Sequence, residues 1–336
     1  MMENILDIGD ETVKIYVTSG SYARYLDRFG VLDSRDFEKD ILEKAITELL
    51  QSVREHIDIK RASFLVYLPP SFAKARIAVA SYKRGDPEKN ISAKESDEIR
   101  MAVLKEAGRD VSDGFAKAYG ILPQDVEFLS QEIIGTKIDG YETSVLEGYG
   151  GENLEFRVLS IFIPKHYLKN FQEIINDSGI KNFKISHPAA NISKSFVAEN
   201  AVLLDMGGEC TQIFLIRNGK LVSIDDFAMG GRNFSRAVSQ IFGLSEEESR
   251  NLKERYANGE LSEISRQKMK EIFLDAAKDW MAHLKARLKT IKGLLPSLLF
   301  LSGGGSKIPE ISEVLSEDDW EVKKYDEKNF RYHTTS

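Results

Sequence analysis

Two stretches of the chain repeat one pattern: Asp7-Ile-Gly-Asp-Glu-Thr-Val-Lys-Ile-Tyr-Val17 and Asp205-Met-Gly-Gly-Glu-Cys-Thr-Gln-Ile-Phe-Leu215. Each stretch follows an apolar run, places Asp-x-Gly at its end, and then resumes the alternation of apolar and polar residues that is typical of a strand. Glycine in such a turn lets backbone N–H groups approach a ligand closely, and these groups form concave anion sites. An aspartate beside the turn is suited to hold a metal ion next to bound phosphates. The repeat predicts two halves that clasp a nucleotide between their turns.

The composition indicates a globular protein with more than one domain. A chain of 336 residues exceeds what one core usually supports, and 42% hydrophobic with 29% charged residues is ordinary for a globular protein. The net charge of −7 argues against nucleic acid as a partner. The single cysteine, Cys210, fits a reducing compartment. Because no signal-peptide pattern and no membrane-spanning apolar run is visible, a cytoplasmic location is expected.

The order of elements predicts a mixed α/β fold. Helices are expected at Ser34–His56, Ser92–Tyr119, His166–Asn176, after Pro188, at Asn233–Phe242, Ser245–Tyr256 and Ser262–Lys292, and from Ile308–Pro309. Strands outside the two repeats are expected at Ala62–Leu68, Val126–Ile138, Leu154–Ile163, Phe183–Ser186 and Ser297–Ser302. Ser92 and Glu95 predict a capping box, and Asn218-Gly219 predicts a hairpin turn.

Three glycine signals follow one another in a fixed order: Asp7-x-Gly, Asp205-x-Gly-Gly and Leu301-Ser-Gly-Gly-Gly-Ser306. They resemble the two phosphate motifs and the adenosine motif of the actin, sugar-kinase and heat-shock-chaperone superfamily. Met229-Gly-Gly-Arg-Asn-Phe-Ser235 resembles a segment of the bacterial cell-division protein FtsA, and Ile138-Asp-Gly-Tyr and Gly150-Gly-Glu-Asn-Leu-Glu-Phe resemble its inserted domain. The pilus assembly protein PilM shares this layout. The chain is therefore identified as a member of the bacterial actin-like FtsA/PilM family, closest to FtsA.

The resemblance implies a two-lobed actin-like fold, a duplication of the ribonuclease H type, with an inserted α+β domain of the SHS2 type. Lobe 1 (subdomain 1A) would comprise residues 1–84 and 166–198, the inserted domain (1C) residues 85–165, and lobe 2 (2A) residues 199–325, followed by a short tail at 326–336. Subdomain 2B, which in FtsA receives the tail of the tubulin-like protein FtsZ, would be reduced, because only Tyr256-Ala-Asn-Gly-Glu-Leu-Ser262 precedes the long helix. The tail is too short and polar for a membrane anchor, so membrane association is expected only through a partner.

The same resemblance implies a site for ATP and Mg²⁺ between the lobes. Asp7 and Asp205 would hold Mg²⁺ through water molecules, and Lys14 would contact the phosphates. The other nucleotide-binding positions would be Gly9, Asp10, Gly207, Gly208, Glu209, Gly230, Gly231, Lys253, Gly303, Gly304, Gly305 and Ser306.

Four residues depart from the pattern of the family. Asp10 stands where relatives carry Gly, Ser or Thr, and Glu209 replaces a glycine next to the phosphates. Each extra carboxylate near a triphosphate costs on the order of 1 kcal/mol, unless extra Mg²⁺ or an outward-turned side chain relieves the repulsion. Arg250 replaces a ribose-contacting glutamate. His187 stands where chaperone-like relatives carry the glutamate that positions the attacking water, so it is either a catalytic group or a capping residue before Pro188.

These departures predict weak or absent hydrolysis and leave three functions open. The first is an FtsA-like scaffold of the cell-division machinery that assembles into filaments or dimers and recruits partners, FtsZ among them. The second is a PilM-like adaptor that docks a peptide from a pilus inner-membrane protein. The third is an active ATPase or phosphotransferase, which Asp10, Glu209 and His187 argue against.

Overall fold

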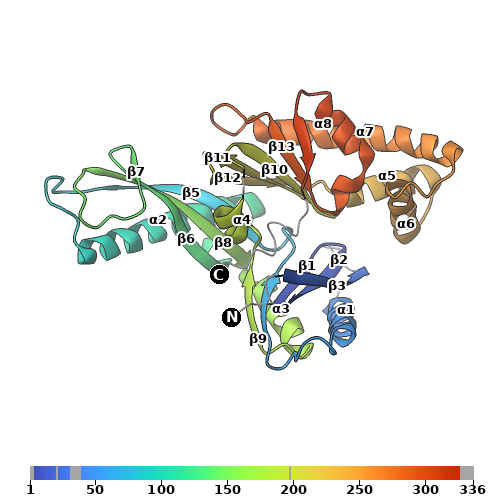
Figure 1. The fold of residues 1–336 in the computed structure, drawn as a ribbon, viewed down its shortest axis with the longest axis horizontal. Coiled ribbons are helices and arrows are strands. Elements are labelled where there is room, and N and C mark those ends of the chain that lie inside the picture. The colour runs from blue at the N-terminus through green and yellow to red at the C-terminus, as the bar shows by residue number, and fades with distance from the viewer. Residues whose placement is uncertain (1–3, 20–21, 31–38, 197, 326–336) are drawn as a thin grey trace.

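The protein consists of two lobes and an arm that extends sideways from the junction between them (Figure 1). The computed structural model describes residues 4–19, 22–30, 39–196 and 198–325. A five-stranded sheet forms the centre of each lobe, and a four-stranded sheet forms the arm. The expected tail at residues 326–336 lies outside the described residues.

Lobe 1 is a sheet with helices packed on it. In sheet order its strands are β3 (Tyr22–Gly30), β2 (Thr12–Ser19), β1 (Asn4–Ile8), β4 (Ser63–Tyr67) and β9 (Asn182–Ser186). Its helices are α1 (Lys39–Ser52) and α3 (Lys165–Asp177), whereas the short α4 (Ala189–Ser195) packs with strands of lobe 2. In α1 the buried residues recur at helical spacing, from Leu42 through Ala45 and Ile46 to Leu49 and Leu50, so one face of the helix joins the core of the lobe. Residues 34–38 of the helix expected here lie outside the described residues.

Lobe 2 has the same sheet order. Its strands are β12 (Lys220–Phe227), β11 (Thr211–Arg217), β10 (Ala201–Met206), β13 (Leu298–Ser302) and β14 (Glu321–Lys324). Its helices are α5 (Gly231–Phe242), α6 (Glu246–Ala257), α7 (Glu263–Leu288), α8 (Pro309–Ser316) and the 3₁₀ turn η2 (Gly304–Lys307). The long helix ends at Leu288, four residues before the expected end at Lys292.

The strand registers of the two lobes confirm the predicted duplication. In lobe 1, Asp7 is paired with Lys14 on the antiparallel neighbour and with Tyr67 on the parallel one. In lobe 2, Asp205 is paired in the same way with Gln212 and Ser302. Because the register places the two aspartates at equivalent points of equivalent sheets, the sequence repeat is a repeat of structure.

The arm is a separate sheet with one long helix on it. In sheet order its strands are β5 (Lys74–Lys83), β8 (Asn153–Pro164), β6 (Val126–Ile138) and β7 (Tyr141–Thr143), and the helix is α2 (Ala93–Tyr119), which the 3₁₀ turn η1 (Pro123–Asp125) follows. Strand β5 was not predicted, and it lies before residue 85, where the inserted domain was expected to begin. The division into domains remains a proposal, and the pairing of β5 with β8 supports a start at residue 74.

The hydroxyl contact of the predicted capping box is present at the start of α2. The Ser92 hydroxyl accepts a hydrogen bond from the Glu95 N–H at 3.2 Å. The Glu95 carboxylate also accepts from the buried guanidinium of Arg84 at 2.8 Å. Arg84 also donates to the carbonyls of Lys89 and Gly151, so one arginine ties the helix to the loops of the arm.

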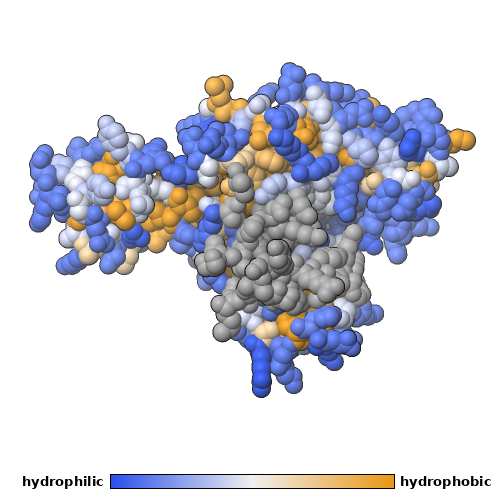
Figure 2. Space-filling view, viewed as in Figure 1, coloured by the Kyte–Doolittle hydropathy of each residue, from blue (hydrophilic) through white to orange (hydrophobic). Residues whose placement is uncertain are grey.

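The arm is held against lobe 2 by an apolar cluster and a buried ion pair. Ala75 and Ile161 of the arm share a core cluster with Leu203 and Phe214 of lobe 2, and Figure 2 shows apolar side chains gathered where the arm joins that lobe. Within this junction the Lys74 ammonium lies 2.6 Å from Asp226 Oδ2, both side chains being almost fully buried.

Two further observations bear on the sequence predictions. No strand lies between α6 and α7 in the described part of the chain, as the expected reduction of subdomain 2B requires. Among the residues that the structure describes, no helix combines the length and the apolar composition that crossing a bilayer demands.

We expect Asp226→Ala to lower the free energy of unfolding by about 3–5 kcal/mol, because it leaves the Lys74 ammonium buried without its carboxylate. Urea denaturation followed by circular dichroism measures the change. The matched control is Asp318→Ala, which breaks the exposed pair with Lys285 and is expected to cost about 1 kcal/mol or less. An equal loss in both variants would contradict the role of the buried pair.

The contribution of Asp226 to the free energy of unfolding is also expected to depend on pH. Burial opposes ionisation of this carboxyl, but the Lys74 and Arg76 cations outweigh burial and hold its pKa below the ordinary value of 3.8. A carboxyl with a lowered pKa stabilises the folded state above its unfolded pKa and loses that contribution as the pH falls through the folded pKa. The stability difference between wild type and Asp226→Ala is therefore expected to stay constant from about pH 8 to about pH 5 and to shrink below pH 3.8.

Candidate nucleotide-binding cleft

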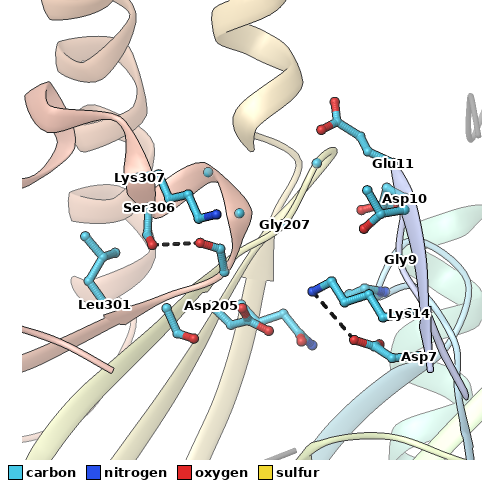
Figure 3. Close-up of a pocket in the computed structure, with 18 of the residues that line it drawn as sticks. Asp7, Gly9, Asp10, Glu11, Lys14, Asp205, Gly207, Leu301, Ser306 and Lys307 are labelled. Atoms are coloured by element: carbon cyan, nitrogen blue, oxygen red, sulfur yellow. Dashed lines mark hydrogen bonds and ion pairs between the residues drawn. The ribbon is translucent and has the colours of Figure 1, made fainter. Parts of the chain in front are cut away.

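A cleft of about 780 Å³ lies between the lobes, at the ends of the repeated strands. Both hairpin turns line it, as does the turn that follows β13. Figure 3 shows Asp205 and Gly207 between the first turn, with Asp10 and Lys14, and the third, with Ser306 and Lys307. The predicted residues that line it are Asp7, Gly9, Asp10, Lys14, Asp205, Gly207, Gly208, Lys253, Gly303, Gly304, Gly305 and Ser306. The structure thus brings together residues from all three glycine signals.

The two repeated turns are built by the same hydrogen bond. Gly9 N–H donates to the Thr12 carbonyl at 2.8 Å, and Gly207 N–H donates to the Cys210 carbonyl at 2.9 Å. A Cβ atom at Gly9 would lie 3.1 Å from the Thr12 oxygen, and one at Gly207 would lie 3.3 Å from the Cys210 oxygen. The backbone therefore folds back so closely that glycine fits best at this point of each turn.

The two turn aspartates are buried at the floor of the cleft. Asp7 and Asp205 are 2% and 3% exposed, and the Lys14 ammonium lies 3.8 Å from Asp7 Oδ2 (Figure 3). Where lobe 1 carries Lys14 beside its aspartate, the register of lobe 2 places the neutral Gln212 beside Asp205. No group of three or more His, Cys, Asp or Glu residues suited to a metal occurs among the described residues. Two carboxylates completed by water and phosphate oxygens are nevertheless the ligand set that Mg²⁺ commonly uses, so the residues fit that ion.

A second set of glycines lets three backbone segments meet behind the cleft. The Gly231 N–H donates to the Gly207 carbonyl and the Arg232 N–H to the Gly208 carbonyl, each at 2.9 Å. A Cβ at Gly230 would lie 2.5 Å from the Gly208 oxygen, and one at Gly305 would lie 2.7 Å from Met206 Cγ. Gly230 and Gly231 therefore support the second turn from behind and do not line the cleft.

Glu209 points away from the cleft. Its Oε1 atom accepts from Arg232 Nη1 at 2.6 Å and from Arg236 Nη2 at 2.9 Å, both arginines being on α5. The outward-turned side chain that the sequence left open as a way to relieve repulsion is thus observed. Glu209 takes part in the site through its backbone N–H.

Asp10 remains between the lobes, and both of its oxygens are hydrogen-bonded. The Ser71 hydroxyl donates to Oδ1 at 2.6 Å, and the Glu209 N–H donates to Oδ2 at 3.2 Å. The side chain is 3% exposed, and burial raises the pKa of its carboxyl despite these two hydrogen bonds. Asp10 is therefore a direct link between the first and the second turn.

Lys253 lines the cleft, but its ammonium is engaged by the protein. It donates to the Gly231 carbonyl at 3.1 Å and lies 3.8 Å from Glu11 Oε2. Burial lowers the pKa of this lysine. The next residue, Glu254, also lines the cleft, whereas Arg250 does not.

His187 is buried outside the cleft. Its Nδ1 atom accepts from the Ala189 N–H at 3.0 Å, and its Nε2 atom lies 2.9 Å from Gln212 Nε2. His187 is 0% exposed, and the N–H that its Nδ1 binds belongs to the first residue of α4. Its catalytic role stays a hypothesis.

Several cleft residues were missed at the sequence level: Gln212, Asn258, Lys307, Lys324 and Tyr325. The sequence could have indicated Lys307 as a cleft residue, because it directly follows Ser306 at the third turn. Lys324 and Tyr325 had none, since strand β14 was not predicted and only its pairing with β13 brings them to the cleft.

We expect Gly303→Ala to destabilise the protein by about 1–3 kcal/mol, since residue 303 has φ +88° and a Cβ there would lie 2.4 Å from the Met206 oxygen. The neighbouring Gly304→Ala is the matched control, because nothing lies within 4 Å of its Cβ position. Urea denaturation compares the two variants, and equal stabilities would show that the third turn is not constrained as described.

Comparison with known proteins shows what this chain is similar to. Residues 202–331 match the sequence profile described as cell division protein FtsA. The chain matches no curated protein sequence. Among solved structures it is similar to a chain of the PilM-PilN type IV pilus biogenesis complex, with 17% identity, coverage of 97% of this chain and 88% of that one, and a TM-score of 0.66.

Two further solved structures have the same fold. The ethanolamine utilization protein EutJ from Carboxydothermus hydrogenoformans is 13% identical, with 96% and 84% coverage and a TM-score of 0.54. MreB 5 of Spiroplasma citri bound to AMPPNP is 10% identical, with 98% and 93% coverage and a TM-score of 0.50. The resemblance predicted from the sequence is therefore confirmed: the chain has the bacterial actin-like fold of the FtsA/PilM type, and residues 202–331 carry the FtsA sequence pattern.

Proposed function

We propose that this protein is an actin-like scaffold that recruits protein partners, and that an adenine nucleotide with Mg²⁺ serves in its cleft as a structural ligand with weak or absent hydrolysis. The observation that carries the proposal is the contact between the two turns. Asp10, which takes its hydrogen bonds from Ser71 and from the backbone of Glu209, joins the lobes at the phosphate end of the cleft. An enzyme that turns over nucleotide needs that space and those donors for its substrate.

The residues of the cleft support a nucleotide ligand as part of this proposal. Asp7 and Asp205 would hold Mg²⁺ through water, Lys14 would neutralise a phosphate, and the turn of Gly303–Ser306 would face the adenosine. MreB 5, which shares the fold, was solved with AMPPNP bound. A bound nucleotide would contact both lobes at once, so it would stabilise one arrangement of the surfaces that partners recognise.

Two partner systems fit the scaffold. An FtsA-like role in cell division is supported by the FtsA sequence pattern of residues 202–331. A PilM-like role as adaptor for a pilus inner-membrane protein is supported by similarity along 97% of the chain to the PilM-PilN complex. The direct connection of α6 to α7 favours the second role, because subdomain 2B receives FtsZ in FtsA. In either role we propose a cytoplasmic protein that reaches the membrane through its partner and forms dimers or filaments.

We expect MgADP or MgATP to bind to the wild type in a calorimetric titration and to bind at least about tenfold more weakly to Asp205→Ala, which removes one carboxylate from the metal site. Asp275→Ala, on an exposed face of α7, is the control and should bind as the wild type does. Phosphate release should be measured on the same samples. Its rate should stay well below about 1 per second, which is the lower end of typical enzyme turnover numbers. A faster turnover would assign the protein to the ATPases and contradict the scaffold proposal.

Two fluorescently labelled peptides, both with sequences from the organism that encodes this chain, distinguish the two partner systems. One is the C-terminal tail of FtsZ, and the other is the cytoplasmic segment of a pilus inner-membrane protein. Fluorescence anisotropy should detect binding of the pilus peptide and none of the FtsZ tail. The reverse result would assign the chain to cell division, and binding of neither would contradict the recruitment role.

A further inference from the structure

The carboxylate of Asp10 occupies a position that an anionic ligand would otherwise take. The N–H of Glu209 is a donor of the second turn, the element that would cradle phosphate oxygens. In this structure that N–H donates to Asp10 Oδ2 at 3.2 Å, while the Ser71 hydroxyl holds the other oxygen at 2.6 Å. The donor is therefore already satisfied by a carboxylate of the other lobe.

The space between the two turns is also filled. A Cβ atom at Gly208 would lie 2.7 Å from Glu11 Cγ and 3.1 Å from Asp10 Cβ. The turns thus meet in van der Waals contact at this end of the cleft. A phosphate group with its oxygens is much larger than a methyl group, so it cannot enter here unless Asp10 and Glu11 move.

The cations at this end are paired with carboxylates of the chain. Arg232 lies 2.6 Å from Glu209 Oε1 and 3.6 Å from Glu11 Oε1. Lys253 donates to the Gly231 carbonyl and lies 3.8 Å from Glu11 Oε2. Elsewhere the cleft is lined by Lys14, which lies 3.8 Å from Asp7 Oδ2, and by Lys307 (Figure 3). A phosphate added at the Asp10 end would therefore meet cations that already have carboxylate partners.

We propose that Asp10 stands in the place of a terminal phosphate and makes the cleft selective for nucleoside diphosphates over nucleoside triphosphates. This inference rests on the proposed function and deepens it by naming the class of ligand. A bound diphosphate would end before the position that the Asp10 carboxylate occupies, and it would still contact Lys14. The third phosphate of a triphosphate would lie against the Asp10 and Glu11 carboxylates. Like charges at this distance, partly screened, separate the two affinities by about tenfold or more.

The test is the ratio of the dissociation constants for ATP and ADP, measured by calorimetry with Mg²⁺ on the full chain. In the wild type, ADP is expected to bind at least about tenfold more tightly than ATP. Asp10→Ser removes both the charge and the volume, and it should bring the ratio close to one, mainly by tightening ATP. Asp10→Asn removes the charge and keeps the shape, so its ratio should fall between the two. Circular dichroism confirms that each variant is folded.

Asp275→Ser is the matched control, because it removes the same carboxylate from an exposed helix face and should leave the ratio unchanged. Equal affinities of the wild type for ATP and ADP would overturn the inference, as would a ratio that neither Asp10 variant alters. Either result leaves the nucleotide site itself intact. If ADP and ATP both fail to bind to the wild type and to both variants, the nucleotide part of the proposed function is wrong and the inference falls with it.

Discussion

The structure depends on the close approach of three backbone segments behind the cleft. The carbonyls of Gly207 and Gly208 accept hydrogen bonds from the first N–H groups of α5, and the turn at Gly303 lies against Met206 and Asp205. No side chain fits between these segments, so their glycines are a condition of the packing. The segments follow β10, precede α5 and follow β13. Their packing therefore fixes where these three elements of lobe 2 meet and where the cleft opens.

The second constraint is the cost of burying charge between the lobes. Asp10, Glu11 and Glu209 would repel one another and any phosphate, and each has instead a partner within the protein: Ser71 and a backbone N–H for Asp10, Arg232 and Lys253 for Glu11, and two arginines of α5 for Glu209. A buried carboxylate is tolerated only when its hydrogen bonds are satisfied. The Asp10 end of the cleft is thus stabilised by the chain itself, as the proposed scaffold, whose lobes stay together, requires.

Local patterns predicted most of the fold. Helix α2 and strands β6 and β8 lie within a residue or so of their expected ranges, because their apolar periodicity and their boundary residues agree. Strand β5 escaped prediction because its sequence, Lys-Ala-Arg-Ile-Ala-Val-Ala-Ser-Tyr-Lys, is defined by pairing with β8 some 80 residues later in the chain. Glu95 illustrates the same limit, because the capping-box pattern does not predict that the buried Arg84 also binds its carboxylate.

The sequence by itself determined that the chain is duplicated, that each half carries an aspartate and a glycine turn, and that the three turns line one cleft. Those features depend on residue types at short spacing. Only the tertiary structure decided that Glu209 turns outward and that Asp10 links the first turn to the second. The bonds responsible join Asp10 to Ser71 across 61 positions and to Glu209 across 199 positions, and no local pattern encodes which distant group a buried carboxylate will meet.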